Sequence, residues 1–231
     1  MRKIFSFTGA KKIVFGNGSI LTLAGHIKEH HAQNPLIVID KNLAKTDLQE
    51  KIASILVSEG IKFTVFDKVE PEPRIELADE GAALAVKNKC DIVIGIGGGS
   101  AMDVAKAIAV IATNKGAAAD YLGLNKVPKA GLPKIMIPTT AGTGSEVTFT
   151  AVFVRKNLKK KEGMNSPYLY PELALLDPEL TLSLPSAPTA QTGLDALCHA
   201  IESYTSINSS PMSEMFSLEA IALIAENLRA C

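Results

Sequence analysis

The sequence predicts an α/β fold, with a parallel sheet covered by helices and followed by the start of an all-helical domain. Two observations predict this fold. Short β-branched runs alternate with amphipathic stretches between residues 36 and 112, and after Pro185 the pattern is helical only. Strands that are apolar throughout, rather than at every second residue, are typical of a parallel sheet buried on both faces.

The expected elements follow from local patterns in chain order. Short strands are expected at 4–7 and 12–15, and a helix from Ser19. Apolar runs predict strands at 36–39, 62–66, 91–96 and 134–137. Amphipathic spacing predicts three helices, at 48–58, 74–88 and 100–111. The first is expected to end before Gly60, and the second to begin after Pro73. Prolines divide residues 145–180 into short strands and loops. We place the domain boundary between residues 184 and 185. Residues 1–184 are expected to form the α/β domain, and residues 185–231 are expected to form the N-terminal part of an incomplete helical domain.

Composition narrows the classes of function. The chain of 231 residues is 47% apolar, 21% charged and formally neutral, which fits a globular protein with a sizeable core. Balanced charge gives no reason to expect nucleic acid or a membrane surface as a partner. The first residues carry no long apolar stretch, so we expect no signal peptide, and no run approaches the length needed to span a bilayer. Cys90, Cys198 and Cys231 lack pairing or metal-site spacing, which indicates reduced thiols in a cytoplasmic protein.

Three consecutive glycines, Gly97, Gly98 and Gly99, stand where a strand gives way to a helix. Glycine lets the backbone turn sharply and leaves its amides open to a phosphate. A helix N-terminus adds partial positive charge and free N–H donors. The pattern therefore predicts a pyrophosphate site. A tight turn with Ser100 as N-cap and Asp103 completing a capping box is compatible with the same residues.

Two further features suit a dinucleotide. Asp40 ends the 36–39 strand, where its carboxylate would bind the adenosine ribose and repel a 2′-phosphate, favouring NAD over NADP. A helix N-cap or a strand-end turn is an equal alternative for Asp40. The loop 138–146 carries four hydroxyls and two glycines. It could hold a nicotinamide, a ribose or a phosphate, or form a plain Ser/Thr turn.

Asp195 and His199 offer half of a metal site. They are four residues apart in a segment of helical character, so both side chains project from one helix face. A carboxylate beside an imidazole suits iron or zinc. Two ligands rarely hold a catalytic metal, and no histidine follows His199 in the chain. For an isolated pair, a capped helix with a satisfied histidine is the alternative.

In this order the motifs resemble those of the iron-dependent (group III) alcohol dehydrogenases, whose nucleotide domain is similar to that of dehydroquinate synthase. The resemblance covers essentially all 231 residues and rests on GGGSAMDVAKAIA, PTTAGTGSEVT and GLDALCHAIESY. It implies a dehydroquinate-synthase-like dinucleotide-binding domain followed by the start of an all-helical metal-binding domain. The implied function is NAD-dependent interconversion of a small alcohol and its aldehyde or ketone by metal-assisted hydride transfer.

The resemblance also implies roles for matching positions. The pyrophosphate would be bound by Gly97, Gly98, Gly99 and Ser100, with Asp103 at that helix start. The adenosine–nicotinamide cleft would be lined by Thr139, Thr140, Thr143 and Ser145. Asp40 would select NAD, and Lys161 would reach the cofactor. Asp195 and His199 would be the first two ligands of Fe²⁺, with Zn²⁺ as the alternative.

The later histidines of the family are absent, so no catalytic residue is assigned and the chain is expected to be the N-terminal portion of a longer enzyme. Two other functions stay open: a nucleotide-binding fragment without catalysis, and a zinc-dependent glycerol or diol dehydrogenase. An apolar stripe over residues 212–228 predicts exposed apolar surface and a possible homodimer.

Overall fold

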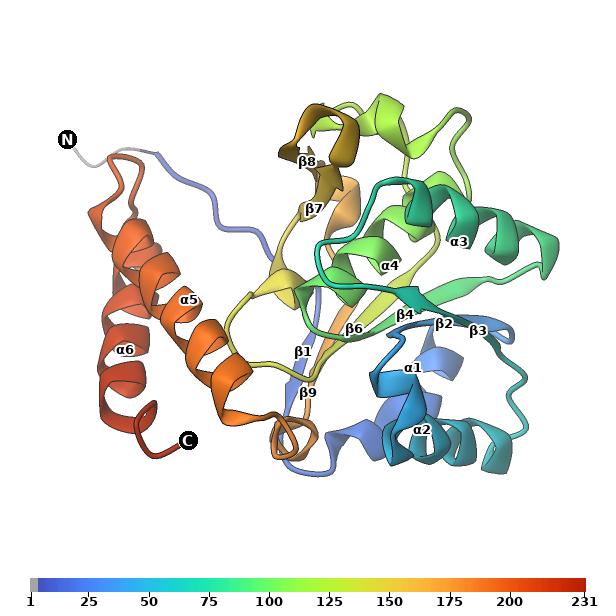
Figure 1. Ribbon diagram of the computed structural model, residues 1–231, viewed down its shortest axis with the longest axis horizontal. Coiled ribbons are helices and arrows are strands. Elements are labelled where there is room, and N and C mark those ends of the chain that lie inside the picture. Colours follow the sequence, from blue (N-terminus) through green and yellow to red (C-terminus); the bar gives the residue numbers. More distant parts are fainter. Residues whose placement is uncertain (1–3) are drawn as a thin grey trace.

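The computed structural model describes residues 4–231, and its central element is a six-stranded parallel sheet. The strand order is β1-β9-β6-β4-β2-β3, so the first strand and the last lie side by side at one edge. The sheet confirms the predicted fold class (Figure 1). Its strands are β1 (Ile13–Phe15), β2 (Pro35–Asp40), β3 (Thr64–Val69), β4 (Ile92–Gly97), β6 (Lys134–Pro138) and β9 (Leu173–Leu176).

Helices cover both faces of this sheet (Figure 1). Successive side chains of a strand point to opposite faces. Leu36 and Val38 of β2 therefore enter one core, while Ile37 and Ile39 enter the other. Burial on both faces explains why these strands are apolar at every position. The first core is covered by α3 (Glu76–Lys87) and α4 (Gly99–Ile111), and the second by α1 (Leu23–Glu29) and α2 (Asp47–Ser58).

A second, three-stranded sheet packs beside α4. Its order is β5-β8-β7, where β7 and β8 form an antiparallel hairpin that turns through Lys159 at a φ of 49°. Phe153 and Met164 of this hairpin are buried in the core that contains α4. Two of its strands, β7 (Thr150–Arg155) and β8 (Lys160–Asn165), lie in the region 145–180 expected to hold short strands and loops, whereas β5 (Gly123–Leu124) precedes that region.

Short 3-10 helices join the main elements. They occur at Ser19–Thr22, Leu43–Lys45, Ala118–Tyr121, Ser145–Val147, Lys156–Leu158, Pro167–Leu169 and Pro178–Thr181. The last of them follows Asp177, whose buried carboxylate accepts hydrogen bonds from the amides of Gly18 and Ile20 at 3.1 Å each. Asp177 thereby ties the end of β9 to the turn after β1.

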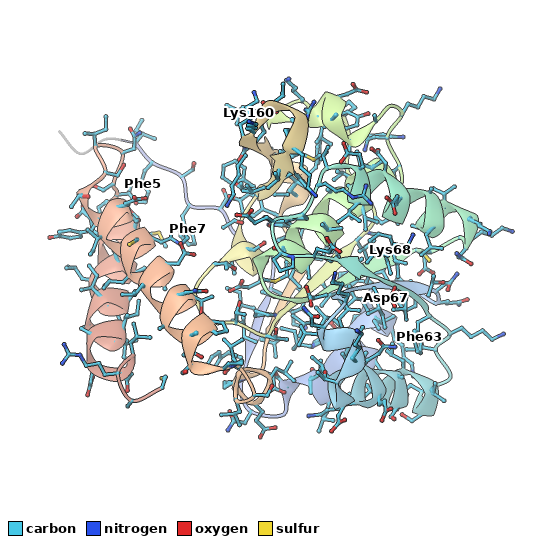
Figure 2. The ribbon with its side chains drawn as sticks, in the orientation of Figure 1. Phe5, Phe7, Phe63, Asp67, Lys68 and Lys160 are labelled. Atoms are coloured by element: carbon cyan, nitrogen blue, oxygen red, sulfur yellow. The ribbon has the colours of Figure 1, made fainter. Side chains whose placement is uncertain are left out.

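The chain ends in two packed helices, α5 (Ser186–Thr205) and α6 (Pro211–Asn227). They approach closely because Gly193 of α5 has no side chain, and a Cβ there would overlap Leu228. The N-terminal segment reaches this pair, and Figure 2 shows Phe5 and Phe7 beside it. The ring of Phe7 stacks on that of Phe216 at 5.8 Å between centroids.

Two expectations about local structure are wrong, and one strand is shifted along the chain. Residues 4–7 form no strand, because Phe7 packs its ring on α6 and the segment leaves the sheet. The strand expected at 62–66 lies at Thr64–Val69, where its backbone pairs with β2. Ser100 is not an N-cap, since α4 begins at Gly99 with Gly98 as the cap and no side chain capping it.

Among the described residues, no helix has both the length and the apolar character needed to cross a bilayer.

Candidate functional site

Neighbouring parallel strands bring three predicted site residues to one edge of the sheet. Ile39 pairs with Ile96, and Gly97 pairs with Pro138, so the chain leaves β2, β4 and β6 at the same level. Asp40, the glycine turn and Thr139 therefore lie at the carboxyl ends of adjacent strands. In open parallel sheets this is the edge at which ligands bind.

The glycine turn is shaped by close neighbours. Gly97 has a φ of 140°, which side chains rarely adopt, and a Cβ there would lie 3.0 Å from that of Ala101. A Cβ at Gly99 would lie 3.2 Å from Cγ2 of Thr143. The Ser/Thr loop thus rests directly on the turn. Because α4 starts at Gly99, the first amides of that helix lack intrahelical acceptors and are available to a ligand.

Thr140 carries a polar atom that fits a bound ligand. Its hydroxyl is buried and has no hydrogen-bond partner among the described residues. A Cβ at Gly98 would lie 3.6 Å from this hydroxyl, so the unpaired group sits beside the turn. A buried hydroxyl without a partner costs free energy that an acceptor such as a phosphate oxygen removes. The unpaired hydroxyl and the open glycine turn together fit a dinucleotide pyrophosphate.

The other predicted residues of this loop bond to protein groups. Ser145 donates its hydroxyl to Oδ1 of Asp103 at 2.6 Å, and the Val152 amide donates to Oδ2 at 2.9 Å. Lys106 pairs with the same Asp103 carboxylate at 3.0 Å. Sequence reasoning missed Lys106, although a single lysine within the apolar run of the helix is a visible signal. Burial lowers the pKa of Lys106, while the charge of Asp103 opposes that shift.

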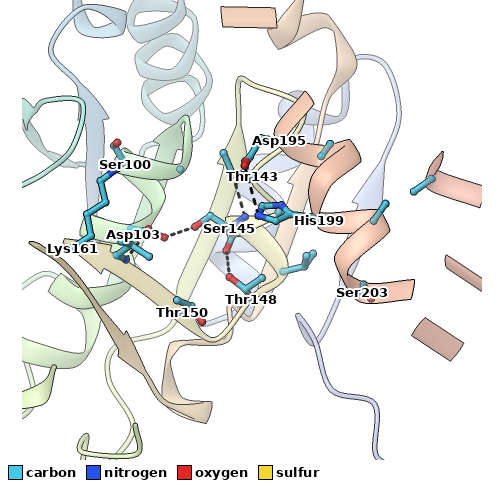
Figure 3. Close-up of a pocket in the computed structure, with 18 of the residues that line it drawn as sticks. Ser100, Asp103, Thr143, Ser145, Thr148, Thr150, Lys161, Asp195, His199 and Ser203 are labelled. Atoms are coloured by element: carbon cyan, nitrogen blue, oxygen red, sulfur yellow. Dashed lines mark hydrogen bonds and ion pairs between the residues drawn. The ribbon is translucent and has the colours of Figure 1, made fainter. Parts of the chain in front are cut away.

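One cavity of about 920 Å³ joins the glycine turn to the predicted metal ligands. Ser100, Thr143 and Ser145 line it, as do Asp195 and His199, which extend from α5 (Figure 3). Oδ1 of Asp195 and Nε2 of His199 are 3.7 Å apart, and the side chains are 48% and 55% exposed. The part of the cavity wall near α6 is largely apolar, and it includes Phe7 of the N-terminal segment and Phe216, Ala220 and Ile224 of α6.

Of the remaining predicted residues, Lys161 lines this cavity and Thr139 and Asp40 do not. Lys161 lines it and forms an ion pair with Glu72 at 2.9 Å between Nζ and Oε1. Thr139 is buried, and its amide donates to the Gly97 carbonyl at 3.0 Å. Asp40 does not line the cavity, and its Oδ1 accepts a hydrogen bond from the Asn42 amide at 2.7 Å, as in a strand-end turn.

The donor set for a metal is incomplete within the described part of the chain. A carboxylate and an imidazole lie side by side on α5, as iron or zinc prefers. No group of three or more histidine, cysteine, aspartate or glutamate side chains is placed to hold an ion in residues 4–231. Asp195 and His199 therefore fit two positions of a metal site whose other ligands are not among these residues.

Comparison with known proteins gives one family. The family described as iron-containing alcohol dehydrogenase matches residues 10–178, and the C-terminal family of Fe-containing alcohol dehydrogenases matches residues 189–231.

Individual relatives agree with this match. Long-chain-alcohol dehydrogenase 1 of Geobacillus thermodenitrificans is 43% identical over 93% of this chain and 54% of that protein. A crystal structure of 1,3-propanediol oxidoreductase superposes with a TM-score of 0.94 at 34% identity, covering 99% of this chain and 60% of that one. Sulfoacetaldehyde reductase from Bifidobacterium kashiwanohense, in complex with NAD⁺, gives 0.90 at 34% identity over 98% and 60% of the two chains. This chain thus spans between about half and three fifths of these proteins' lengths. The chain belongs to the iron-containing alcohol dehydrogenase family.

Proposed function

We propose that this chain forms the cofactor-binding part, and the first half of the metal site, of an NAD-dependent oxidoreductase. The enzyme interconverts a small alcohol and its aldehyde or ketone by metal-assisted hydride transfer. The observation that carries the proposal is the shared cavity, which both Gly99 of the glycine turn and the Asp195–His199 pair line. Names of similar proteins, which include alcohol dehydrogenases and a reductase in complex with NAD⁺, support the same reaction class.

For the dinucleotide, the glycine turn and Ser100 bind the pyrophosphate through the amides at the start of α4. The Thr140 hydroxyl supplies a further donor there, and Thr139, Thr143 and Ser145 shape the cleft. Asp40 bonds the adenosine ribose, and Lys161 exchanges its ion pair with Glu72 for the cofactor. When bound, NAD accepts the hydride. Asp103 lines the cavity, and its two oxygens accept hydrogen bonds from the Ser145 hydroxyl and the Val152 amide, so it orders the loop beside the dinucleotide.

For the metal, Asp195 and His199 hold Fe²⁺, with Zn²⁺ as the alternative. A divalent ion in this position supplies Lewis-acid chemistry on the alcohol oxygen. The alternative is a glycerol dehydrogenase type of enzyme, which would use zinc and a diol substrate in place of iron and a simple alcohol. Metal analysis and a substrate screen separate the two.

A second function is nucleotide binding without catalysis. It is favoured because no third metal ligand is placed beside Asp195 and His199 among the described residues. Metal affinity falls with ligand number, so a two-ligand site retains an ion poorly. The test is NADH formation by the purified chain with Fe²⁺ and a panel of alcohols, alongside NAD titration. Binding without turnover supports the second function for this chain, and measurable turnover excludes it.

A variant at Asp40 tests the cofactor choice. Asp40→Asn removes the charge that repels a 2′-phosphate, so the ratio of Kd for NADP to Kd for NAD is expected to fall about tenfold. An Asp47→Asn variant at the exposed start of α2 serves as the control. An unchanged ratio in Asp40→Asn contradicts the assigned role.

We further propose that residues 1–184 and 185–231 belong to separate domains, which the start of α5 at Ser186 supports. A cytoplasmic location fits three cysteines that are free in the described structure. A homodimer fits the apolar surface of α5 and α6.

A further inference from the structure

The helical pair α5 and α6 is attached to the α/β domain near the start of α5. This helix begins at Ser186, shortly after the last strand of the sheet, so the covalent link enters the pair at that end. The Ser/Thr loop meets the same end, because a Cβ on Gly142 would overlap the Thr192 carbonyl oxygen. A body that is held only at one end can pivot about that end.

The two helices run antiparallel, which places Phe216 away from this attachment. Gly193, near the start of α5, packs against Leu228, just after the end of α6. The start of α6 therefore lies level with the end of α5. Phe216 is in the second turn of α6 and thus lies towards the remote end of the pair. Asp195 and His199 lie between the two ends.

The N-terminal segment reaches that remote end from the edge of the sheet (Figure 1). The Lys11 amide donates to the Pro171 carbonyl at 3.1 Å, and Nζ of Lys11 pairs with Oε1 of Glu172 at 3.2 Å. Phe7 stacks on Phe216 with 5.8 Å between ring centroids and 29° between ring planes. Residues 7–11, which we call the clasp, therefore join the sheet edge directly to α6.

The clasp belongs to the wall of the cavity that holds the candidate site. Phe7 and Phe216 line this cavity together with Gly99 of the glycine turn and Asp195. A rotation of the helical pair about the start of α5 would separate the two rings. The same rotation would carry Asp195 away from the glycine turn. The ring contact and the spacing of the two halves of the site are thus mechanically linked.

The strength of this contact suits positioning better than folding. Phe7 and Phe216 remain 59% and 52% exposed, and neither ring belongs to the two cores of the sheet domain. An aromatic pair changes an equilibrium constant by about two- to tenfold beyond the effect of buried area. Such a contact changes how much of the chain has the helical pair held close, while the cores decide whether the sheet domain folds.

We propose that Phe7 is a positioning residue and that the clasp holds the remote end of the helical pair against the α/β domain. It thereby sets the spacing between the glycine turn and the Asp195–His199 pair. The importance of that spacing rests on the proposed function, whereas the clasp itself is a property of the fold. Without the Phe7 ring, the helical pair is expected to swing outwards about the start of α5.

The experiment measures a distance distribution between two spin labels by pulsed electron paramagnetic resonance. The labels are attached at Lys87→Cys on α3 and Glu219→Cys on α6, both at exposed positions, in the full chain with its three natural cysteines replaced by alanine. Phe7→Ala is expected to shift the distribution to longer distances, with the population beyond the main peak rising about two- to tenfold. Urea unfolding is expected to match that of the parent chain.

The matched control removes the same ring from elsewhere in the N-terminal region. Phe15 lies on β1 at the edge of the sheet and is 74% exposed. Phe15→Ala is expected to leave the distance distribution unchanged. Phe7→Tyr keeps an aromatic ring in the clasp and is expected to retain the distribution of the parent.

Phe216→Ala removes the contact from its other side and decides the case if Phe7→Ala does not fold. Because the two rings act through each other, the double variant is expected to give the same distribution as either single variant. An additive widening in the double variant overturns the inference.

The remaining outcomes separate this inference from the proposed function. An unchanged distribution in Phe7→Ala, or equal widening in Phe7→Ala and Phe15→Ala, overturns the clasp. NADH titration of the labelled parent is run alongside. Widening in Phe7→Ala alone, with no NADH bound by the parent, supports the clasp and counts against the proposed function. NADH binding by the parent with an unchanged distribution in Phe7→Ala overturns only the clasp.

Discussion

At the glycine turn, single missing side chains determine what can bind. Gly99 occupies an ordinary helical position, so its value does not lie in backbone freedom. Its hydrogen atom instead lets Thr143 approach α4 closely at the edge of the space assigned to a pyrophosphate, because a Cβ there would lie 3.2 Å from Cγ2 of Thr143. Affinity and stability are therefore separable at this residue.

Gly99→Ala is expected to weaken NAD binding about tenfold while changing the free energy of unfolding by less than ~1 kcal/mol. The new methyl group would lie 3.2 Å from Cγ2 of Thr143 and push the Ser/Thr loop away from the turn, whereas alanine favours the helix over glycine. Calorimetric titration and urea unfolding measure the two effects. Gly25→Ala in α1, where a Cβ meets nothing within 4 Å, is the control and should leave Kd unchanged. Unaltered affinity in Gly99→Ala would place the phosphate elsewhere.

Glu146 gives a pH-dependent prediction. Burial raises the pKa of its carboxyl group above 4.5, against smaller opposing effects of its own backbone amide and Lys106. The folded state therefore holds the proton more tightly than the unfolded state, and the carboxylate lowers stability as pH rises through the window between 4.5 and the folded-state pKa. Glu146→Gln should be more stable than the parent at pH 7, with the difference shrinking towards pH 4. Urea unfolding at both values measures it, and a difference independent of pH contradicts the assignment.

At the scale of elements, the Ser/Thr loop is held between two helices. Lys106 and Asp103 attach it to α4, and Gly142 places it against α5, because a Cβ on Gly142 would overlap the Thr192 carbonyl oxygen. The contact joins the loop to the helix that carries Asp195 and His199. It is a route by which the cofactor side and the metal side of the cavity keep their spacing.

Gly142→Ala is expected to destabilise the fold by about 1–3 kcal/mol for two reasons: helix backbone cannot move aside as a flexible side chain does, and side chains rarely adopt the φ of 157° found at Gly142. It should also speed the exchange of amides at the start of α5. Gly144→Ala is not a suitable control, because Gly144 has a φ of 64°. Gly9→Ala, whose Cβ would meet only the Val147 carbonyl at 3.8 Å, is suitable and should unfold like the parent. Equal stability of both variants would mean that the loop does not rest on α5.

At the scale of the whole molecule, the helical pair presents an apolar surface. Leu194 and Ile201 of α5 and Met215, Leu218 and Leu223 of α6 are each roughly half exposed. Of α6, only Ser217 is buried, although the helix is rich in apolar residues. Exposed apolar side chains in this number favour association.

The chain is therefore expected to self-associate as its concentration rises, which sedimentation velocity measures. Leu218→Lys with Leu223→Lys should shift the distribution towards monomer by placing charges in that surface. Val57→Lys with Val86→Lys, at scattered exposed positions on α2 and α3, is the matched control and should leave it unchanged. A stable monomer of the parent chain at high concentration would contradict this expectation.

Local pattern was sufficient for much of this molecule. Strands such as Ile92–Gly97 are apolar at every position because both faces of the sheet are covered, and that property is written in consecutive residues. The glycine run and the Asp195–His199 spacing are equally local. A backbone bend depends on consecutive residues, and a shared helix face depends on residues three or four positions apart. The sequence by itself therefore determined the fold class, the bend before α4 and a pair of donors on α5.

Only tertiary structure decided what depends on distant partners. Residues 4–7 have strand-like composition but pack on α6, because Phe7 meets Phe216 more than 200 positions away. Lys106 shows its purpose only once Ser145 and Thr150 are beside it, and the glycine turn and Asp195 share a cavity only because the chain folds back across the sheet. Burial, ion pairing and cavity walls are properties of neighbours in space, which local spacing along a chain does not specify.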